Sequence, residues 1–510
     1  MNSVPHAPVC ENTRMNITKR TVYFFGVICL ALASACRVTT PAIHTNEIIR
    51  APYVQLATPE SIYVVWRTDG DITPVVRYGK TPDRPDQKVS GKAILTRIAP
   101  DKGAAAARKK IARLHSAPAG TSQYEAHLTG LKPDTRYDYA VYDGEKRLAG
   151  GDESYHFTTP PAQGADKPMR FWVVGDSGNG GQIQAAVHWA MVNLTANENH
   201  PIDFFLHVGD MAYGKGTESE FQKFFFAMYE PTLRHTVFWP AMGNHEGSTS
   251  RGSTGVGPYY DAFVLPTNGE AGGVASGKEA FYAFDFGRAH FISLDSHDLD
   301  RKPTGPMARW LQADLERTKA DWVIAYWHHA PYTKGSHDSD KESQIAEMRS
   351  FILPILEAGG VDLVLTGHSH IYERSMLMDG AYATPTVAEK VILDDGDGDP
   401  NGDGAYKKSA GRHPHEGTVQ VVAGNGGGNL NRRGTMPVMR KTIVEHGSVM
   451  VDINGDTLTA FMLNKLGEKR DTFSIVKRGK VTPTRIAKPW QPPYWAPPKS
   501  LEKQKADDDD

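Results

Sequence analysis

Cysteine is almost absent from this chain of 510 residues, and its three copies all lie near the N-terminus. They are Cys10, Cys29 and Cys36, so no position after 36 can take part in a disulfide. Removal of an N-terminal leader would leave at most one cysteine, which excludes an internal disulfide in the mature chain. The fold is therefore expected to be held by packing, with metal ions as the remaining means of cross-linking.

A strong net charge and a long apolar run are also lacking. The chain has 57 Lys and Arg residues against 59 Asp and Glu residues, a formal net charge of -2. This balance gives no electrostatic basis for binding nucleic acid. The N-terminal apolar run from Val22 to Leu32 is shorter than the roughly 20 residues that a membrane-spanning helix needs.

That N-terminal run has the pattern of an export signal. Lys19-Arg20 precede it, and the small residues Ala33-Ser34-Ala35 follow it, directly before Cys36. The arrangement resembles a bacterial lipobox, in which the cysteine becomes the lipidated first residue, although Ala33 stands where leucine is usual. Simple cleavage after Ala35 is the alternative. We expect residues 1–36 to direct the protein to the bacterial periplasm or outer membrane, with a lipid on Cys36 as its only membrane contact.

A chain of this length is too long for one core, so two domains with tails are expected. After a linker at 37–47, residues 48–160 contain short alternating runs such as SIYVVWRT and PVVRYGK, which predict an all-β module. The segment LTGLKPDTRYDYAVYDG resembles the end of a fibronectin type III-like sandwich. We interpret this module as a supporting domain.

Beyond a linker at 161–168, residues 169–478 alternate buried-type strands with helical patterns, which predicts an α/β layered domain. One helix is expected after Gly305, and a second over 343–358 with a kink at Pro354. The expected apolar faces are Met307, Trp310, Leu311 and Leu315 in the first helix, and Ile345, Met348, Ile352 and Ile355 in the second. Residues 479–510 are a proline-rich, charged tail, expected to be extended or disordered.

Potential metal ligands follow five strands of this domain. They are Asp176 in GDSG, Asp210 and Tyr213 in GDMAY, Asn244 and His245 in GNHE, His328 in WHHAP, and His368 and His370 in GHSH. Carboxyl ends of strands in an α/β fold meet at one crevice, so these loops are expected to converge. Each motif alone has an ordinary explanation, such as a helix cap or a turn. Their joint occurrence at strand ends favours a metal site.

Together, the motifs GDxG, GDxxY, GNHE, HxxP and GHxH resemble the calcineurin-like metallophosphoesterase superfamily and, within it, the purple acid phosphatases. HIYERS at 370–375 and VVAGNGG at 421–427 match as well. A fibronectin-like domain before the catalytic domain resembles the large plant-type enzymes. The resemblance covers residues 48–478 and implies a four-layer α/β catalytic domain, a β-sandwich flanked by helices.

The resemblance also implies two metal ions. Fe(III) would take Asp176, Asp210, Tyr213 and His370, and a divalent Zn, Mn or Fe ion would share Asp210 and take Asn244, His328 and His368. Phenolate and carboxylate suit a trivalent ion, whereas imidazole and amide oxygen suit a softer divalent one. A metal-bound hydroxide would then attack the phosphorus of a phosphate ester. The resemblance places His245 beside the leaving oxygen.

Three assignments near the metal ligands stay open at this point. In WHHAP, the family spacing favours His328 over His329, although Ala330 replaces a usual proline. His337 stands where plant-type enzymes bind substrate, and a solvated loop histidine is the alternative. Glu246 is interpreted as a residue that orients a histidine.

The segment DDGDGDPNGDG, from Asp394 to Gly404, has the spacing of half a calcium loop at Asp397, Asp399 and Asn401. The twelfth position of such a loop is Lys408 rather than glutamate, so an EF-hand is excluded. A calcium site and a solvated acidic loop are the two hypotheses.

The sequence therefore predicts an exported dinuclear acid phosphatase that hydrolyses phosphomonoesters. A phosphodiesterase or nucleotidase of the same superfamily is the alternative within enzymes, because leaving-group pockets lie on variable loops. A non-catalytic surface binding protein is the alternative outside them. The oligomeric state is left open, although the cysteine-linked dimer of plant-type enzymes is excluded after Cys36.

Overall fold

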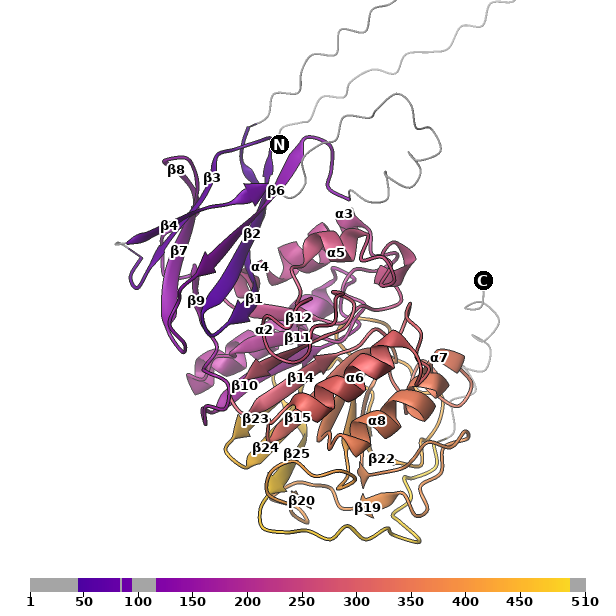
Figure 1. Cartoon of the computed structure of the whole chain (residues 1–510). Helices are drawn as coiled ribbons and strands as arrows, with labels where there is room; N and C mark the ends of the chain where they lie inside the picture. The colour runs from indigo at the N-terminus through magenta and orange to yellow at the C-terminus, as the bar shows by residue number, and fades with distance from the viewer. Residues whose placement is uncertain (1–44, 83–84, 94–115, 496–510) are drawn as a thin grey trace, which may run out of the picture. The chain divides into compact units, whose positions relative to one another are not determined.

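The computed structural model describes residues 45–82, 85–93 and 116–495 (Figure 1). The predicted signal, the lipid anchor at Cys36 and the last part of the tail lie outside these residues. Within the described ranges, every helix is too short or too polar to cross a membrane.

The N-terminal domain consists of two antiparallel sheets (Figure 1). Its strands are β1 (Ile48–Thr58), β2 (Ser61–Asp69), β3 (Pro74–Gly79), β4 (Gln87–Ser90), β5 (Lys92–Ala93), β6 (Thr121–Thr129), β7 (Arg136–Asp143), β8 (Lys146–Gly150) and β9 (His156–Thr158). One sheet has the order β1-β2-β6-β5, and the other β4-β3-β7-β8 with β9 paired to β7. Alternation predicted β2, β3, β7 and β9 because successive side chains in a strand point to opposite faces. Trp66, Val76 and Val141 are thereby buried.

The second domain is built on two sheets of seven strands each. The first, here the β10 sheet, contains β10 (Met169–Val174), β11 (Phe204–His207), β12 (Val237–Pro240), β20 (Tyr406–Lys408), β23 (Gly447–Asn454), β24 (Thr457–Asn464) and β25 (Lys469–Lys477). Its order is β12-β11-β10-β23-β24-β25-β20, with β10, β11 and β12 parallel.

The second sheet, here the β15 sheet, contains β13 (Tyr282–Phe286), β14 (Ala289–Ser293), β15 (Trp322–His329), β16 (Leu363–Gly367), β17 (Tyr372–Ser375), β21 (Val419–Ala423) and β22 (Met439–Ile443). Its order is β13-β14-β15-β16-β21-β17-β22, and β14, β15, β16 and β21 are parallel. A separate pair is formed by β18 (Leu377–Met378) and β19 (Ile392–Asp394).

Helices pack against the outer faces of these sheets or lie in the segments that connect their strands. They are α2 (Gln182–Glu198), α3 (Glu218–Glu220), η1 (Phe221–Phe226), α4 (Ala227–Leu233), η2 (Glu246–Ser248), α5 (Pro258–Ala262), α6 (Pro306–Arg317), α7 (Ser343–Glu347), η3 (Met348–Ile352) and α8 (Leu353–Ala358). The Phe171 ring packs against Phe291 of the opposing sheet, 5.3 Å between centroids. Trp172, the next residue, faces His188 of α2 instead. The domain is thus a β-sandwich flanked by helices, as predicted.

The helix expected after Gly305 is α6. Its Met307, Trp310, Leu311 and Leu315 are all buried, which confirms the predicted face. Asp314 on the same helix contacts the β15 sheet through Nε2 of His290, at 2.7 Å. The apolar periodicity predicted this helix because α6 is a continuous α-helix, so its apolar residues form one stripe that packs on the sheet.

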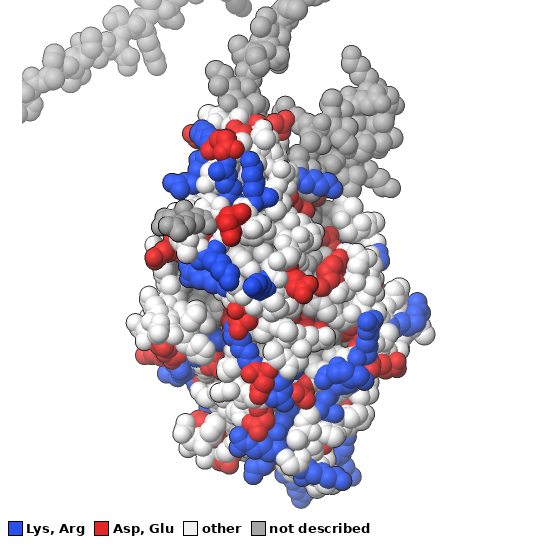
Figure 2. Space-filling view, turned by 60° about the vertical axis from the view of Figure 1, so that its left-hand side comes forward, with Lys and Arg blue, Asp and Glu red and all other residues white. Residues whose placement is uncertain are grey.

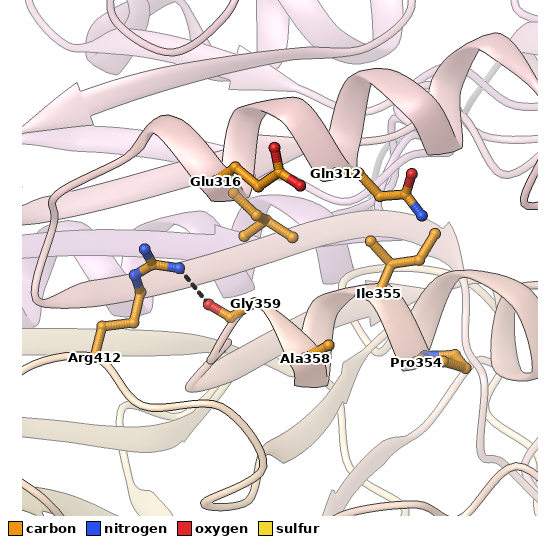
Figure 3. Close-up of a pocket in the computed structure, with 8 residues that line it drawn as sticks. Gln312, Glu316, Pro354, Ile355, Ala358, Gly359 and Arg412 are labelled. Atoms are coloured by element: carbon orange, nitrogen blue, oxygen red, sulfur yellow. Dashed lines mark hydrogen bonds between the residues drawn. The ribbon is translucent and has the colours of Figure 1, made fainter.

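The helix expected over 343–358 differs from the prediction. It consists of α7, the π-helical turn η3 and α8, and Pro354 lies in the first turn of α8 rather than at a kink in mid-helix. A π-turn adds a residue and so rotates the following side chains about the axis. Leu353 and Leu356 are buried as a result, while Ile355 lines a surface groove beside Gln312 of α6 (Figure 3).

The N-terminal domain is joined to the second domain by buried polar contacts. Arg50 of β1 and Arg67 of β2 both form ion pairs with Glu218 of α3. The Tyr53 hydroxyl donates to the carbonyl oxygen of Ala262, at 2.6 Å. These contacts tie the first two strands to α3, which follows β11, and to α5, which follows β12.

The first part of the tail, residues 479–495, lies along the second domain. The backbone N–H of Ile486 donates to the carbonyl of Ile392, and that of Trp490 donates to Asp395. The Arg440 guanidinium lies over the Trp490 ring. This stretch is extended, as expected, and the acidic loop is among its contacts.

On the face shown in Figure 2, basic and acidic side chains are interspersed rather than gathered by sign. This distribution agrees with the formal net charge of -2.

Candidate metal centre

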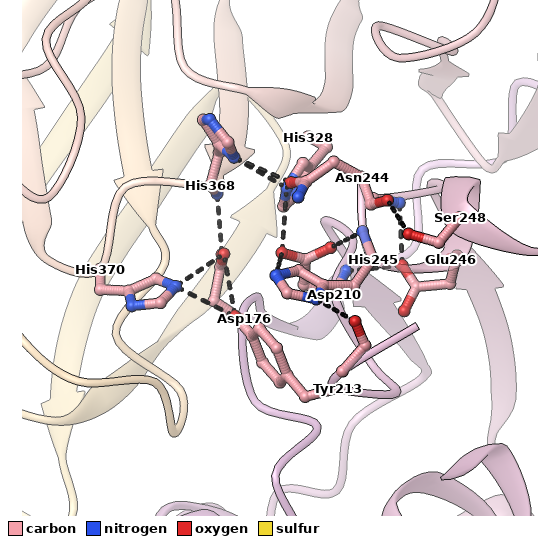
Figure 4. A network of polar contacts seen from close by, with 12 residues as sticks. Asp176, Asp210, Tyr213, Asn244, His245, Glu246, Ser248, His328, His368 and His370 are labelled. Atoms are coloured by element: carbon pink, nitrogen blue, oxygen red, sulfur yellow. Dashed lines mark hydrogen bonds and ion pairs between the residues drawn. The ribbon is translucent and has the colours of Figure 1, made fainter. Parts of the chain in front are cut away.

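The predicted ligands come together at the carboxyl ends of five strands (Figure 4). Asp176 follows β10, Asp210 and Tyr213 follow β11, Asn244 follows β12, His328 lies near the end of β15, and His368 and His370 follow β16. Three of these strands belong to the β10 sheet and two to the β15 sheet. The centre therefore lies where the carboxyl edges of both sheets meet.

One group of donor atoms contains a phenol. The Tyr213 hydroxyl oxygen lies 3.0 Å from Nε2 of His370 and 3.4 Å from Oδ1 of Asp176. Nε2 of His370 lies 3.5 Å from the same carboxylate oxygen. Metal–ligand bonds of about 2.0–2.2 Å place neighbouring ligands at roughly such separations. These three side chains can therefore bind one ion.

A second group consists of one amide and two imidazoles. Oδ1 of Asn244 lies 2.9 Å from Nε2 of His328 and 3.0 Å from Nδ1 of His368. The two ring nitrogens are 3.2 Å apart. All three atoms are ligand atoms that present lone pairs to a common point, as a cation requires.

Asp210 lies between the two groups. Its Oδ2 is 3.3 Å from Nε2 of His328, and its Oδ1 accepts the backbone N–H of His245 at 3.0 Å. The charge of the Asp210 carboxylate also acts on Tyr213 in the first group of donor atoms. Burial raises the pKa of Tyr213 well above its ordinary value, and the charges of Asp176 and Asp210 raise it further. Asp210 is thus placed to be shared by two ions.

Charge balance at this centre calls for cations. Asp176 and Asp210 are almost fully buried, and their described ion-pair partners are histidines rather than lysines or arginines. Burial works to lower the pKa of His328, but the Asp210 charge outweighs it and raises that pKa to about 9. Buried carboxylates are costly unless positive charge compensates them. The donor set and its charge therefore fit bound metal ions.

The backbone is strained at three of the predicted ligands. Asp176, Asp210 and His368 have φ angles of 54°, 59° and 66°, in the left-handed region that non-glycine residues rarely adopt. Each such residue costs on the order of 1–3 kcal/mol, and such strain gathers at functional sites. Gly209, before Asp210, cannot be replaced, because a Cβ there would lie 2.5 Å from Nδ1 of His328.

Glu246 was expected to orient a histidine, and that prediction is wrong. Its carboxylate accepts four backbone N–H groups, from Asp210, Met211, Ala212 and Gly243, at 2.8–3.0 Å. Burial and the neighbouring Asp210 charge raise its pKa, and the backbone N–H hydrogen bonds oppose that rise by stabilising the ionised form. Glu246 therefore joins the loop after β11 to the loop after β12. The sequence signal, a glutamate after GNH, did not show which backbone it would bind.

His245 lies beside the ligands with its side chain about one-third exposed. Its Nδ1 donates to the carbonyl oxygen of Gly214 at 2.8 Å, and its Nε2 lies 3.8 Å from Oδ2 of Asp210. The ring packs edge-on against Tyr213. The hydrogen bond leaves Nε2 as the nitrogen that faces the centre.

The two histidines of WHHAP point to different sides. His328 faces Asp210 and Asn244, whereas Nδ1 of His329 lies 2.8 Å from the Ser296 hydroxyl. The structure thus brings His328 into the ligand group and leaves His329 as a buried neighbour.

His337 stacks on the predicted ligand His368, 3.7 Å between ring centroids. Glu342 joins them, with Oε1 2.9 Å from Nδ1 of His337 and Oε2 3.4 Å from Nε2 of His368. The structure places His337 over a ligand, at the margin of the centre. Sequence reasoning missed Glu342, whose only signal was a carboxylate five residues after that histidine.

The acidic loop shows no comparable convergence. Oδ1 of Asp397 accepts the backbone N–H groups of Asp399 and Asp403, and Oδ1 of Asp399 accepts that of Asn401. Among the described residues, the groups of three close ligand side chains do not include this loop. Calcium binding stays a prediction. Calorimetric titration of D397N/D399N tests it, since a calcium signal unchanged from wild type would contradict the site.

Glu357, Asp379 and His415 form a further group with ligand atoms within 4.8 Å of one another. Asp379 already holds the Arg485 guanidinium, and burial raises the pKa of Glu357 to about 8. A proton on Glu357 accounts for the approach of the two carboxyl groups. We therefore interpret these three residues as a cluster that stabilises the fold rather than as a metal site.

Comparison with known proteins gives two family matches. The profile described as Calcineurin-like phosphoesterase matches residues 169–372, and that described as Purple acid Phosphatase, N-terminal domain, matches residues 49–159. An uncharacterised Mycobacterium tuberculosis protein is 29% identical over 289 residues, covering 51% of this chain and 52% of its own. Purple acid phosphatase 21 of Arabidopsis thaliana is 27% identical over 352 residues, which cover 68% of this chain and 70% of that relative.

The chain thus spans about half the length of the mycobacterial relative. Among solved structures, a purple acid phosphatase from yellow lupin seeds has a TM-score of 0.62 at 18% identity, covering 86% of this chain and 75% of its own. At that identity the likeness shows a shared fold.

Proposed function

We propose that this chain, which joins a calcineurin-like phosphoesterase domain to a purple acid phosphatase N-terminal domain, hydrolyses phosphomonoesters. One observation carries the proposal. Two groups of convergent donor atoms lie on either side of Asp210, and one of them contains the phenol of Tyr213. This is the arrangement that a two-metal hydrolase requires.

The donor chemistry divides the two metal positions. Asp176, Asp210, Tyr213 and His370 would hold Fe(III), because phenolate and carboxylate are hard anionic ligands. Asp210, Asn244, His328 and His368 would hold Zn, Mn or Fe(II), because imidazole and amide oxygen suit a divalent ion. When bound, such a pair supplies Lewis acidity and lowers the pKa of water.

The remaining polar groups would act on the substrate. With its Nδ1 proton committed to the Gly214 carbonyl, His245 presents Nε2 to the leaving oxygen of a phosphate ester. His337, with one-third of its side chain exposed, lies over His368 and would contact the same substrate.

Turnover by metal-replete protein tests the proposal. We expect hydrolysis of an aryl phosphomonoester, little hydrolysis of a bis-aryl diester, and loss of activity in Asp210→Asn. A preference for the diester would instead support a phosphodiesterase. Absence of both activities, with iron and a divalent metal shown by elemental analysis, would support a non-catalytic binding protein.

We further infer that the protein is exported and carries a lipid on Cys36. The basic pair, apolar run and small residues before Cys36 support this inference. Expression of full-length protein with Cys36→Ser tests it. We expect the variant to move from the membrane fraction to the soluble periplasmic fraction, and an unchanged membrane fraction would contradict lipidation.

A further inference from the structure

The His245 ring packs edge-on against Tyr213, and its Nδ1 forms a hydrogen bond with an exposed backbone carbonyl. Nδ1 of its ring donates to the Gly214 oxygen, and Gly214 and Lys215 are both exposed to solvent. Hydrogen bonds rather than packing therefore fix this part of the loop, and the Thr249 hydroxyl is one donor, to the Lys215 carbonyl at 2.9 Å. Whatever holds the Gly214 peptide also sets where Nε2 of His245 lies.

Glu220 holds that peptide through its carboxylate. Oε1 accepts the backbone N–H of Gly214 at 2.9 Å, and Oε2 accepts that of Lys215 at 3.2 Å. Oε2 also accepts the backbone N–H and the hydroxyl of Thr217, both at 2.8 Å. Partial burial works to raise the Glu220 pKa, but these hydrogen bonds outweigh it and hold the pKa below its usual value. The carboxylate is thus ionised at neutral pH.

Glu220 is itself held at a rigid place. Thr217 and Glu220 form a capping box at the start of α3, in which each side chain binds the backbone of the other. Glu218, between them, is buried and paired with Arg50 and Arg67 of the N-terminal domain. The turn that carries Glu220 is therefore fixed by contacts from another domain.

We propose that Glu220 is a positioning residue for His245, acting through the Gly214 peptide. This proposal rests on the proposed function, in which His245 acts at the leaving oxygen. The Glu220 carboxylate fixes the Gly214 carbonyl, and that carbonyl fixes the tautomer and orientation of the His245 ring. Nε2 of His245 therefore stays directed at the metal centre. The N-terminal domain contributes by clamping Glu218.

Leaving-group dependence in the metal-replete full chain tests this role. Glu220→Ala is expected to lower kcat for phenyl phosphate about tenfold more than for 4-nitrophenyl phosphate, with KM little changed. The reason is that positioned proton donors contribute factors of about 10²–10⁴, and a poor leaving group depends on them more. Glu220→Gln keeps one acceptor oxygen and is expected to restore part of the loss. In a His245→Ala background, Glu220→Ala is expected to cost nothing further.

Glu270 supplies a matched control, because its carboxylate also accepts loop N–H groups, from Thr267 and Asn268. Glu270→Ala is expected to leave both substrates unaffected. A Glu220→Ala loss that is equal for both substrates, or that adds to His245→Ala, would overturn the proposal. If wild-type protein hydrolyses neither substrate, the proposed function fails. A crystal structure of Glu220→Ala then decides the positioning role, and an unmoved His245 ring would overturn it.

Discussion

Replacing Glu246 by glutamine is expected to loosen the metal centre. The carboxylate accepts two backbone N–H groups with each oxygen, and a glutamine amide turns one of those oxygens into a donor. Two buried N–H groups then lose their acceptor and face an NH₂ group instead. Each such loss costs about 1–3 kcal/mol, so the variant is expected to lose roughly 2–6 kcal/mol.

This cost falls on the metal ligands because Glu246 holds the backbone N–H of Asp210 itself and that of Gly243, which precedes Asn244. Changes around metal ligands typically weaken metal binding by about 10–100-fold, and we expect a loss of this size. Elemental analysis after dialysis against graded chelator concentrations measures it.

Glu416→Gln is the matched control, since Glu416 is buried and accepts the backbone N–H and hydroxyl of Ser409, outside the ligand loops. It is expected to lower the melting temperature while retaining metal as wild type does. Equal metal retention by Glu246→Gln and wild type would refute the reasoning, because the four hydrogen bonds would then have no part in holding the ligands.

Three further predictions follow from the structure. Tyr213→Phe is expected to abolish the visible charge-transfer band of the iron-loaded protein while far-UV circular dichroism stays unchanged; a coloured variant would contradict phenolate ligation. Burial works to lower the pKa of His290, but its two flanking aspartates outweigh it and raise that pKa to about 9 from 6.5. The protonated His290 therefore stabilises the folded state, fully below pH 6.5, and this stabilisation is lost as the pH rises through 9. Denaturant titrations at several pH values should show about 3 kcal/mol lost in wild type relative to His290→Gln. Glu218→Ala leaves two buried arginines uncompensated and is expected to cost about 3–5 kcal/mol, measured by thermal melting.

The sequence predicted the strands and α6 because their signals are local. A run such as MRFWVV is buried along its whole length, and the stripe on α6 repeats with the helical period. The π-turn before Pro354 escaped prediction, since the register of a helix face after an inserted residue depends on what the helix packs against.

The convergence of the seven candidate ligands was predictable for a similar reason. Asp176, Asp210 and Asn244 each follow a glycine just beyond a strand, so the motif itself contains both the donor and the turn that exposes it. The roles of Glu246, Glu342 and Glu220 were not predictable, because each carboxylate binds groups that its own local sequence does not specify.

By itself, the sequence determined the fold class and the donor chemistry of this protein, because strand periodicity and ligand type reside in short segments. The tertiary structure decided which carboxylates hold the ligand loops in place, which histidine of WHHAP faces Asp210, and how the N-terminal domain reaches the loop beside His245. Those outcomes depend on distances between segments far apart in the chain, and only folding brings such segments within hydrogen-bonding reach.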